Sequence, residues 1–206
     1  EIILSVSVSV VVASLKKNAS YWEQAPGELA YYVLPDDYPE VQLAVLREMA
    51  GDTLLLVANV GGVLGASYDV EFCQMLRDAP DEVDALARRT LAAGLERARR
   101  FRDLGADIAM TASDIADNSG PFFKPHQMER FVLPYLEQWS DGVQAMGMVS
   151  LLHSDGNLTP HLDRIAGTSL DALQAIDPVA GMDLVGSKEI VGDRLCLCGN
   201  LDCGLL

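Results

Sequence analysis

The chain has 206 residues, of which 50% are hydrophobic, and this length and composition predict a single domain with a substantial core. A formal net charge of -15 leaves no general basic surface, which excludes nucleic acid and acidic membranes as general partners. Residues 2–13 are apolar but interrupted by serines, too short to cross a bilayer and unlike a secretory signal, so we expect no membrane span and a cytoplasmic location.

The first elements that can be assigned lie after residue 34, because residues 1–34 carry no clear pattern. A turn near Pro35 precedes an amphipathic run over residues 40–49. Residues 53–58 are a continuous apolar run bounded by turn residues, which is typical of a strand covered on both faces in a parallel sheet.

A long helix and a second strand follow. Pro80 and the acids after it begin the helix, and Gly105 ends it. Residues 106–113 predict the second strand. Residues 125–147 predict another helix, kinked at Pro134 because proline removes a backbone donor.

The rest of the chain alternates regularly between strands and helices. Residues 148–153, 171–176 and 194–198 predict strands, and residues 159–167 and 183–191 predict the short helices between them. The three strands begin at residues 148, 171 and 194, every 23 residues, which is about the minimum length of a βα unit.

This alternation predicts an α/β fold with parallel strands and right-handed crossovers. Polar residues follow four successive strands, and no G-x-G-x-x-G follows any strand, which favours a barrel over an open sheet with one switch point. We therefore predict that residues 1–206 form one TIM-type (β/α)8 barrel domain that is incomplete in this chain. Five strands are assigned, and residues 2–13 are a candidate for one more.

The densest polar cluster in the chain is His153-Ser154-Asp155-Gly156-Asn157, directly after a predicted strand. His153 and Asp155 are two residues apart, so an extended backbone projects both to one side. An imidazole and a carboxylate so placed could share a metal ion or a proton, or grip a polar substrate. The alternative is structural: a histidine at the barrel rim and an Asp155 that caps the next helix.

Other polar residues occupy equivalent positions after neighbouring strands. Asp114 and Asp117 follow the second strand, where paired carboxylates could do acid–base work, hold a cation, or merely cap a loop. Three further polar residues are candidates because they follow the later strands at equivalent positions, although each alone is a weak signal. They are Asp177, Asn200 and Asp202.

The remaining cysteines and histidines receive structural interpretations. Cys196 and Cys198 project to one side of a strand with no loop between them, which favours small buried side chains over a metal pair. Cys203 lies past the strand end and is interpreted as an ordinary cysteine. His126 and His161 begin helices and are predicted to lie at the surface.

Several of these segments, in this order, resemble the uroporphyrinogen decarboxylase family over roughly residues 35–206. The resemblance rests on the set of segments and not on any one of them. The segments are residues 101–107, 114–123, 125–135, 153–157, 177–183, 192–193 and 199–202.

The resemblance implies a (β/α)8 barrel and one of two chemistries. One branch of the family decarboxylates the acetate groups of a tetrapyrrole without a cofactor, and the other transfers methyl groups to or from a corrinoid or a thiol with the help of zinc. Residues 199–202 resemble the decarboxylase closely, whereas the segments after the first strand and around Asp114 depart from it. In the methyltransferase branch, zinc is held by a histidine and a cysteine two residues on. His153 matches the histidine, and Asp155 stands where the cysteine would be.

The resemblance therefore implies a zinc-assisted methyltransferase that acts on a small-molecule methyl donor, with a corrinoid carried by a partner protein. His153 and Asp155 would hold the zinc, because oxygen can also ligate that ion, and Asp114 would join them in catalysis. The expected substrate contacts follow the strand ends. They are Asp117, Asn157, Asp177, Asn200 and Asp202.

Two other functions remain open. The first is decarboxylation of a tetrapyrrole, with Asp114 or a neighbour facing the pyrrole nitrogens. It would need a local basic pocket, and the arginines within residues 97–102 are the nearest candidates, although they could equally form a solvated helix face. The second is a non-catalytic barrel that binds a ligand or partner. The sequence does not decide the oligomeric state, and a homodimer is kept as one alternative.

Overall fold

The computed structural model describes residues 43, 45–49, 51 and 54–205, apart from the side chain of Cys203. Residues 43 and 45–49 are helical, as the amphipathic run predicts. The predicted turn near Pro35 and the candidate strand at residues 2–13 lie outside the described residues.

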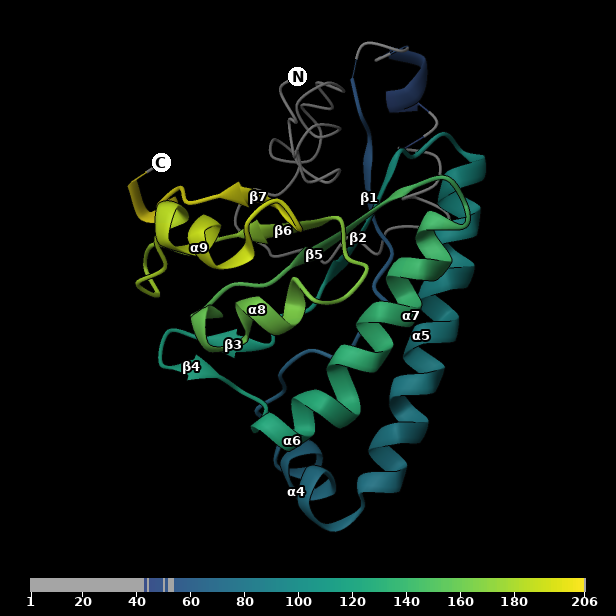
Figure 1. Ribbon diagram of the computed structural model, residues 1–206. Coiled ribbons are helices and arrows are strands. Elements are labelled where there is room, and N and C mark those ends of the chain that lie inside the picture. The colour runs from purple at the N-terminus through teal and green to yellow at the C-terminus, as the bar shows by residue number, and fades with distance from the viewer. Residues whose placement is uncertain (1–42, 44, 50, 52–53, 206) are drawn as a thin grey trace, which may run out of the picture.

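Along the described chain, strands alternate with helices (Figure 1). The strands are β1 (Val57–Asn59), β2 (Ile108–Ala112), β3 (Ala116–Asp117), β4 (Gly120–Pro121), β5 (Val149–His153), β6 (Ala172–Ala175) and β7 (Cys196–Gly199). The α-helices are α4 (Val70–Asp78), α5 (Pro80–Asp103), α6 (Pro125–Gln127), α7 (Leu133–Gln144), α8 (Leu162–Ile165) and α9 (Leu184–Val191). A π-helical turn η1 (Met128–Val132) and the 3-10 turns η2 (Thr159–His161) and η3 (Cys203–Leu205) complete the series.

Five strands form one parallel sheet in the order β1-β2-β5-β6-β7. Each strand therefore lies beside the next sheet strand along the chain, and the order never reverses. An open doubly wound sheet reverses at a switch point, whereas a (β/α) barrel does not. The prediction of five parallel strands from an incomplete barrel is confirmed, with each strand shorter than its apolar run.

The two faces of this sheet bury different side chains. Ala109, Leu152 and Leu173 alternate onto the face that packs against the helices and belong to the main core. Ile108 and Leu151 lie on the opposite face, in a smaller cluster that corresponds to the barrel interior. Burial on both faces explains why the strands are continuous apolar runs instead of alternating ones.

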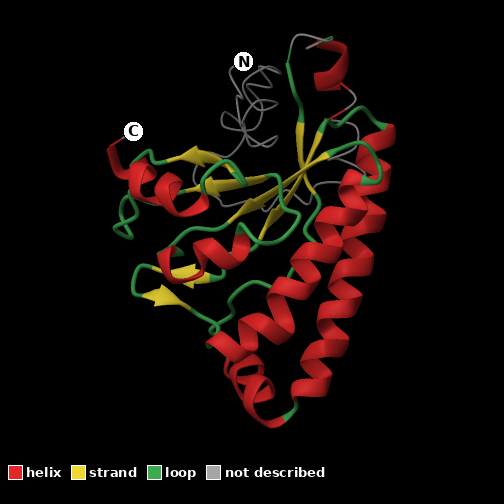
Figure 2. Ribbon diagram, viewed as in Figure 1, coloured by secondary structure: helices red, strands yellow, loops and turns green. Residues whose placement is uncertain are grey.

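Helices α5 and α7 pack side by side along the sheet, and α8 and α9 cover its later strands (Figure 2). The fully buried Trp139 of α7 and the buried Phe101 of α5 join the main core. Burying the large apolar ring of Trp139 stabilises the fold, although its buried Nε1–H has no hydrogen-bond partner among the described residues. These aromatic side chains pack helices α5 and α7 against one face of the sheet.

The predicted kink at Pro134 takes the form of the π-helical turn η1. The backbone N–H of Leu133 donates to the carbonyl of Met128, five residues back. Since Pro134 has no N–H to donate, the wider turn before it absorbs the break in the hydrogen-bond ladder. Helix α7 then begins at Leu133.

Two elements were not predicted from the sequence. Helix α4 is short and has no fully buried residue, although Phe72, Met75 and Leu76 pack against the core and the Asp69 side chain caps the helix by accepting from the backbone of Glu71. The β3–β4 hairpin has only two residues in each strand, too few for a periodic pattern. Both elements lie in the loops that follow strands β1 and β2.

A glycine inside α5 sets how closely that helix approaches the loop after β1. A Cβ added to Gly94 would lie 2.7 Å from the carbonyl oxygen of Gly61 and would also collide with the backbone of Gly62. Backbone atoms cannot swing aside as a side chain can. The packing of α5 against the first strand therefore needs glycine at position 94.

We expect Gly94→Ala to lower the free energy of unfolding by about 2 kcal/mol, although alanine is the better helix former by about 1 kcal/mol. Gly142→Ala in α7 is the matched control, because its Cβ would meet only the flexible side chain of Leu95 at 2.6 Å. That variant should stay within about 1 kcal/mol of the parent protein. Urea denaturation of both variants measures the difference, and equal stabilities would contradict the backbone clash.

Among the described helices, none has both the length and the apolar composition that crossing a bilayer requires.

Candidate metal centre at the carboxyl ends of the strands

The carboxyl ends of β2 and β5 bring the main candidate residues together. His153 is the last residue of β5 and lies between Ala112 of β2 and Gln174 of β6 in the sheet register. Asp114 follows β2 by two residues, and Asp155 follows β5 by two residues. Because parallel strands end at the same edge, these side chains share one rim of the barrel.

Three ligand atoms converge at this rim. The Nε2 atom of His153 lies 3.9 Å from Oδ1 of Asp114 and 3.8 Å from Oδ2 of Asp155. One possible ligand atom from each of the three residues lies within 4.8 Å of the other two. The sequence predicts a metal site at His153 and Asp155, and the geometry brings Asp114 beside them as a third residue that could hold a cation.

The spacing of these atoms suits a zinc ion. Nitrogen and oxygen ligands lie about 2.0–2.2 Å from zinc, so neighbours in a tetrahedron are ~3.4 Å apart. The distances from His153 exceed this value by about half an ångström, which small side-chain rotations can close. Two carboxylates and an imidazole leave a fourth position open, as catalytic zinc sites do.

Hydrogen bonds orient the side chains of Asp114 and His153 and hold the loop that carries Asp155. Asp114 Oδ1 accepts from the backbone N–H of Asp155 at 2.9 Å, which ties the two acidic loops together. His153 Nδ1 lies 3.1 Å from Oε1 of Gln174 on the neighbouring strand. The fully buried Ser154 hydroxyl accepts from the backbone N–H of Ile115 at 3.0 Å. The side of the cluster that faces the protein is therefore fixed.

The outer side of the cluster is open to solvent. The side chains of Asp114 and Asp155 are 54% and 61% exposed, whereas that of His153 is 28% exposed. A cation bound here would be reachable by a substrate from the rim.

Gly156 allows the loop after β5 to approach the β3–β4 hairpin. Its φ of +86° lies in the left-handed region, and a Cβ there would come within 2.6 Å of the backbone nitrogen of Asp117. The backbone N–H of Asn157 donates to the Asp117 carbonyl at 2.8 Å across this contact. The glycine in the motif is therefore needed for the close approach of the two loops.

The two aspartates that follow β2 have different environments. Asp114 joins the cluster, but the Asp117 carboxylate accepts from the Tyr68 hydroxyl at 2.6 Å and from the backbone of Ser119 at 2.7 Å. The Tyr68 hydrogen bond is the main cause that lowers the pKa of Asp117, and the same bond raises the pKa of Tyr68. Asp117 thus stabilises the hairpin turn, and its contact with substrate stays a prediction.

Two further predicted substrate contacts also hold turns. The Asn157 side-chain oxygen accepts from the backbone of Thr159 at 3.0 Å, where η2 begins. Asp177 accepts from the backbone of Val179 at 2.8 Å and, weakly, from Gly156 at 3.4 Å. These bonds organise the rim, and a substrate role for either residue stays a prediction.

Asn200 holds the strained end of β6. Its side-chain nitrogen donates to the carbonyls of Ile176 at 2.8 Å and Met182 at 3.1 Å. Ala175 and Ile176 have φ values of 111° and 45°, which non-glycine residues adopt only where neighbours enforce them. Asp202 accepts from the backbone of Gly204 at 2.8 Å. Substrate contacts by Asn200 and Asp202 likewise stay predictions.

The prediction that Cys196 and Cys198 are buried is wrong for Cys196, which is exposed. Both residues lie on β7, the outermost strand of the sheet among the described residues, and Cys198 is half-buried. Burial is the first cause that raises the pKa of the Cys198 thiol to about 11, and the neighbouring Cys196 is the second. Cys198 is therefore a protonated thiol at neutral pH.

The prediction that His161 lies at the surface is wrong, because its side chain is buried. His126 is exposed, as predicted. The side chain of His161 is 5% exposed, and its Nδ1 has no hydrogen-bond partner among the described residues. Burial lowers the pKa of His161, and the nearby Arg164 cation lowers it further. The η2 turn thus packs inward instead of lying on the surface.

The folded chain should therefore lose stability in mild acid. Because the pKa of His161 is lower in the folded state, the unfolded chain binds the proton first as the pH falls through about 6.5. Stability contributed by the neutral ring is present above that value and is lost below it. We expect His161→Phe to flatten the dependence of unfolding free energy on pH between about 7.5 and about 5.5. His126→Phe is the matched control and should keep the slope of the parent protein.

Gln174 contacts the described cluster and was not predicted from the sequence. It lies inside a predicted strand, in a mostly apolar run, and an isolated glutamine there gives no pattern. Only the register, which pairs it with His153, reveals its role.

Comparison with known proteins locates the chain within a family. The family described as uroporphyrinogen decarboxylase matches residues 35–206, and no curated protein matches the chain by sequence. Among solved structures, the chain is similar to a methyltransferase from Methanosarcina mazei, with a TM-score of 0.68 and 20% identity over 85% of this chain and 54% of that one.

A second solved structure is a protein provisionally assigned as a dihydrodipicolinate synthetase from Pseudomonas aeruginosa. Its TM-score of 0.38 and identity of 13%, over 81% of this chain and 53% of that one, are too low to support an argument. The chain spans about half the length of both structures. At 20% identity, the likeness to the methyltransferase concerns the fold.

Proposed function

Because this chain belongs to the uroporphyrinogen decarboxylase family, we propose that it carries the metal centre of a zinc-assisted methyltransferase that works with a corrinoid on a partner protein. The observation that supports this proposal is the convergence of Asp114, His153 and Asp155 within 4.8 Å. Asp114, His153 and Asp155 would hold the zinc, which would supply Lewis-acid chemistry to a bound methyl acceptor or methyl donor.

The residues of the chain supply a charge-balanced binding site. Asp114 and Asp155 together contribute two negative charges, which a divalent cation neutralises, and the neutral ring of His153 adds none. The hydrogen bond from the Asp155 backbone keeps Asp114 oriented toward the imidazole. The exposed outer edges of both carboxylates leave the approach open to a small methyl donor or acceptor.

The protons released on binding also have nearby acceptors. A thiol acceptor must lose its proton before its sulfur attacks a methyl group, because the thiolate is the nucleophile. Asp114 Oδ1 is already a hydrogen-bond acceptor at this site, and each aspartate has a second oxygen. We therefore assign Asp114 and Asp155 the additional role of holding that proton.

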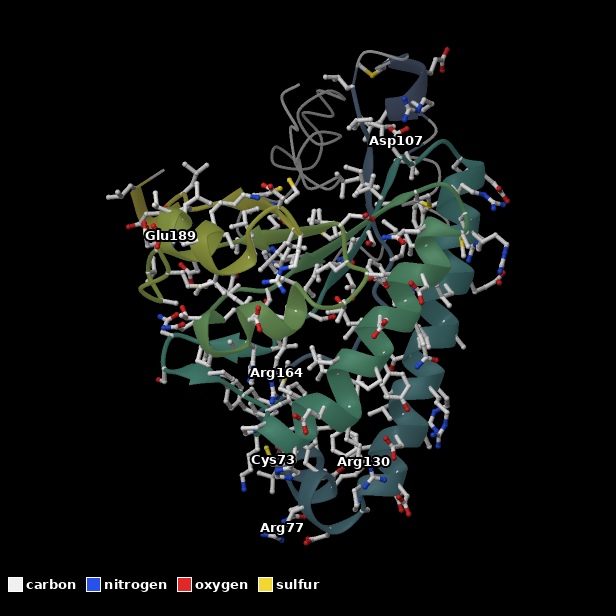
Figure 3. The ribbon with its side chains drawn as sticks, viewed as in Figure 1. Cys73, Arg77, Asp107, Arg130, Arg164 and Glu189 are labelled. Carbon is white, nitrogen blue, oxygen red and sulfur yellow. The ribbon has the colours of Figure 1, made fainter. Side chains whose placement is uncertain are left out.

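Decarboxylation of a tetrapyrrole is the second candidate, supported by the family match and by the decarboxylase-like residues 199–202. Its substrate carries many carboxylates, yet the rim is acidic. Arg130, labelled in the lower part of the view in Figure 3, is paired with Asp81 at 2.6 Å and with Asp84 at 2.5 Å. Arg164, labelled in the same view, is paired with Glu129 at 2.9 Å. These pairings weaken the case for an anionic tetrapyrrole.

The arginines of α5 give that candidate little support either. Arg99 is paired with Glu96 and Arg102 with Asp103, both on exposed parts of the helix. Arg97 donates to the carbonyl of Val60 at 2.6 Å. Arg99 and Arg102 therefore lie on a solvated helix face, which is one of the two alternatives that the sequence left open for these arginines.

One preparation of the protein can distinguish the two reactions. We expect it to bind zinc, to transfer a methyl group to or from a corrinoid, and to lose that activity with a chelator and regain it with added zinc. Uroporphyrinogen should not be converted to coproporphyrinogen. Methyl transfer that persists in a zinc-free protein would refute the role of the metal, and coproporphyrinogen formation would establish the decarboxylase.

A further inference from the structure

The side chain that faces the inner nitrogen of His153 is an amide. Gln174 Oε1 lies 3.1 Å from His153 Nδ1, and the two residues are direct partners in the β5–β6 register. We infer that Gln174 is a positioning residue that holds His153 in the tautomer with the proton on Nδ1 and the lone pair of Nε2 directed at Asp114 and Asp155. The consequence for metal binding rests on the proposed function, whereas the tautomer itself does not.

An amide oxygen can only accept a hydrogen bond. The ring nitrogen that faces it must therefore carry the proton, which leaves Nε2 with its lone pair. A neutral imidazole in water favours the other tautomer, with the proton on Nε2. That form would direct an N–H at the two carboxylates and would have no lone pair for a cation.

Backbone contacts fix the position of Gln174 beside the ring. The N–H of Ser154 donates to the Gln174 carbonyl at 3.2 Å, so the two strands stay joined beyond the histidine. Immediately after Gln174, the positive φ values of Ala175 and Ile176 bend the chain, and Asn200 holds that bend through the Ile176 carbonyl at 2.8 Å. Because several contacts determine this bend, the backbone of Gln174 stays beside His153, within reach of its ring.

An amide also suits the charge of the site better than a carboxylate would. Many metal-binding histidines donate to a carboxylate, which adds a negative charge. Asp114 and Asp155 already balance a divalent ion, so a third carboxylate would leave the centre with a net negative charge. Glutamine orients His153 without that cost.

Nitrogen-15 NMR of the histidine rings tests the inference without any metal. The chain has three histidines, His126, His153 and His161, and His153→Gln identifies the signal of interest. At about pH 9, where imidazole rings are neutral, we expect the Nδ1–H pattern for His153 in the parent protein. Gln174→Met, which fills similar volume without an acceptor, should convert His153 to the Nε2–H pattern. Gln174→Glu, which keeps an acceptor oxygen, should restore Nδ1–H.

An Nε2–H pattern in the parent protein would overturn the inference, because the amide would then donate through its nitrogen. So would an unchanged pattern in a folded Gln174→Met variant, with unchanged signals from the other two rings as the test of folding. Zinc titration gives a second readout, with affinity about 10- to 100-fold weaker in Gln174→Met and nearer to parental in Gln174→Glu. If the parent protein binds no zinc, the proposed function fails, and the ring pattern still decides the inference.

Discussion

His153→Ala is expected to remove bound zinc and to lower the kcat/KM of methyl transfer by about a thousandfold or more. A Lewis-acid metal stabilises the charge of a transition state by several kcal/mol, and ~4 kcal/mol corresponds to ~10³ in rate. His153 is the only nitrogen ligand in the described cluster and the residue from which both carboxylate distances are measured. Without it, two exposed aspartates remain, and such groups hold transition metals weakly.

The measurements are zinc content by mass spectrometry of the metal and steady-state methyl transfer on the same samples. His126→Ala is the matched control, since that histidine is exposed and lies on α6, outside the cluster. It should keep the metal and the rate. Removal of the imidazole should also change the fold little, because His153 is partly exposed. Retention of stoichiometric zinc in folded His153→Ala would refute the assignment.

The fold could be predicted because its signals are local. Five apolar runs bounded by turn residues predicted the five sheet strands, and Pro80 and Gly105 marked the two ends of α5 within two residues. Three of the runs overestimated strand length because buried apolar residues also precede the strands, as Ala106, Met148 and Leu195 do. Helix α4 was missed because it is short and buries its apolar residues only partly, and its start is marked by one capping side chain.

The site could be predicted only as far as strand order determines it. His153 and Asp155 share a side because they are two residues apart on an extended chain, and Asp114 joins them because β2 pairs with β5. Asp117 was grouped with Asp114 by proximity in sequence, but the hairpin turns its carboxylate toward Tyr68. The pairing of Gln174 with His153 depends on register to a single residue, which no local pattern specifies.

The residue that departs from the family's zinc site also offers the sharpest gain-of-function test. Asp155 stands where the methyltransferase branch has cysteine, and its carboxylate Oδ2 already lies 3.8 Å from His153 Nε2. We expect Asp155→Cys to tighten zinc binding by about ten- to a hundredfold, or ~1.4–2.7 kcal/mol, because a soft thiolate binds zinc more strongly than a carboxylate. The backbone N–H at this position would still donate to Asp114, so that ligand keeps its orientation.

Cobalt substitution makes the new bond visible. Co(II) in Asp155→Cys should show a sulfur-to-metal charge-transfer band in the near ultraviolet. The zinc affinity of this variant should also depend more steeply on pH than that of the parent protein, because the thiol must deprotonate on binding. Ser119→Cys is the matched control: it adds a thiol at an exposed position of the hairpin turn, next to the site but outside the cluster. A charge-transfer band in Asp155→Cys alone would place the metal between His153 and residue 155. The same affinity and no band in both variants would mean that this rim does not hold the metal, whatever its resemblance to the zinc branch.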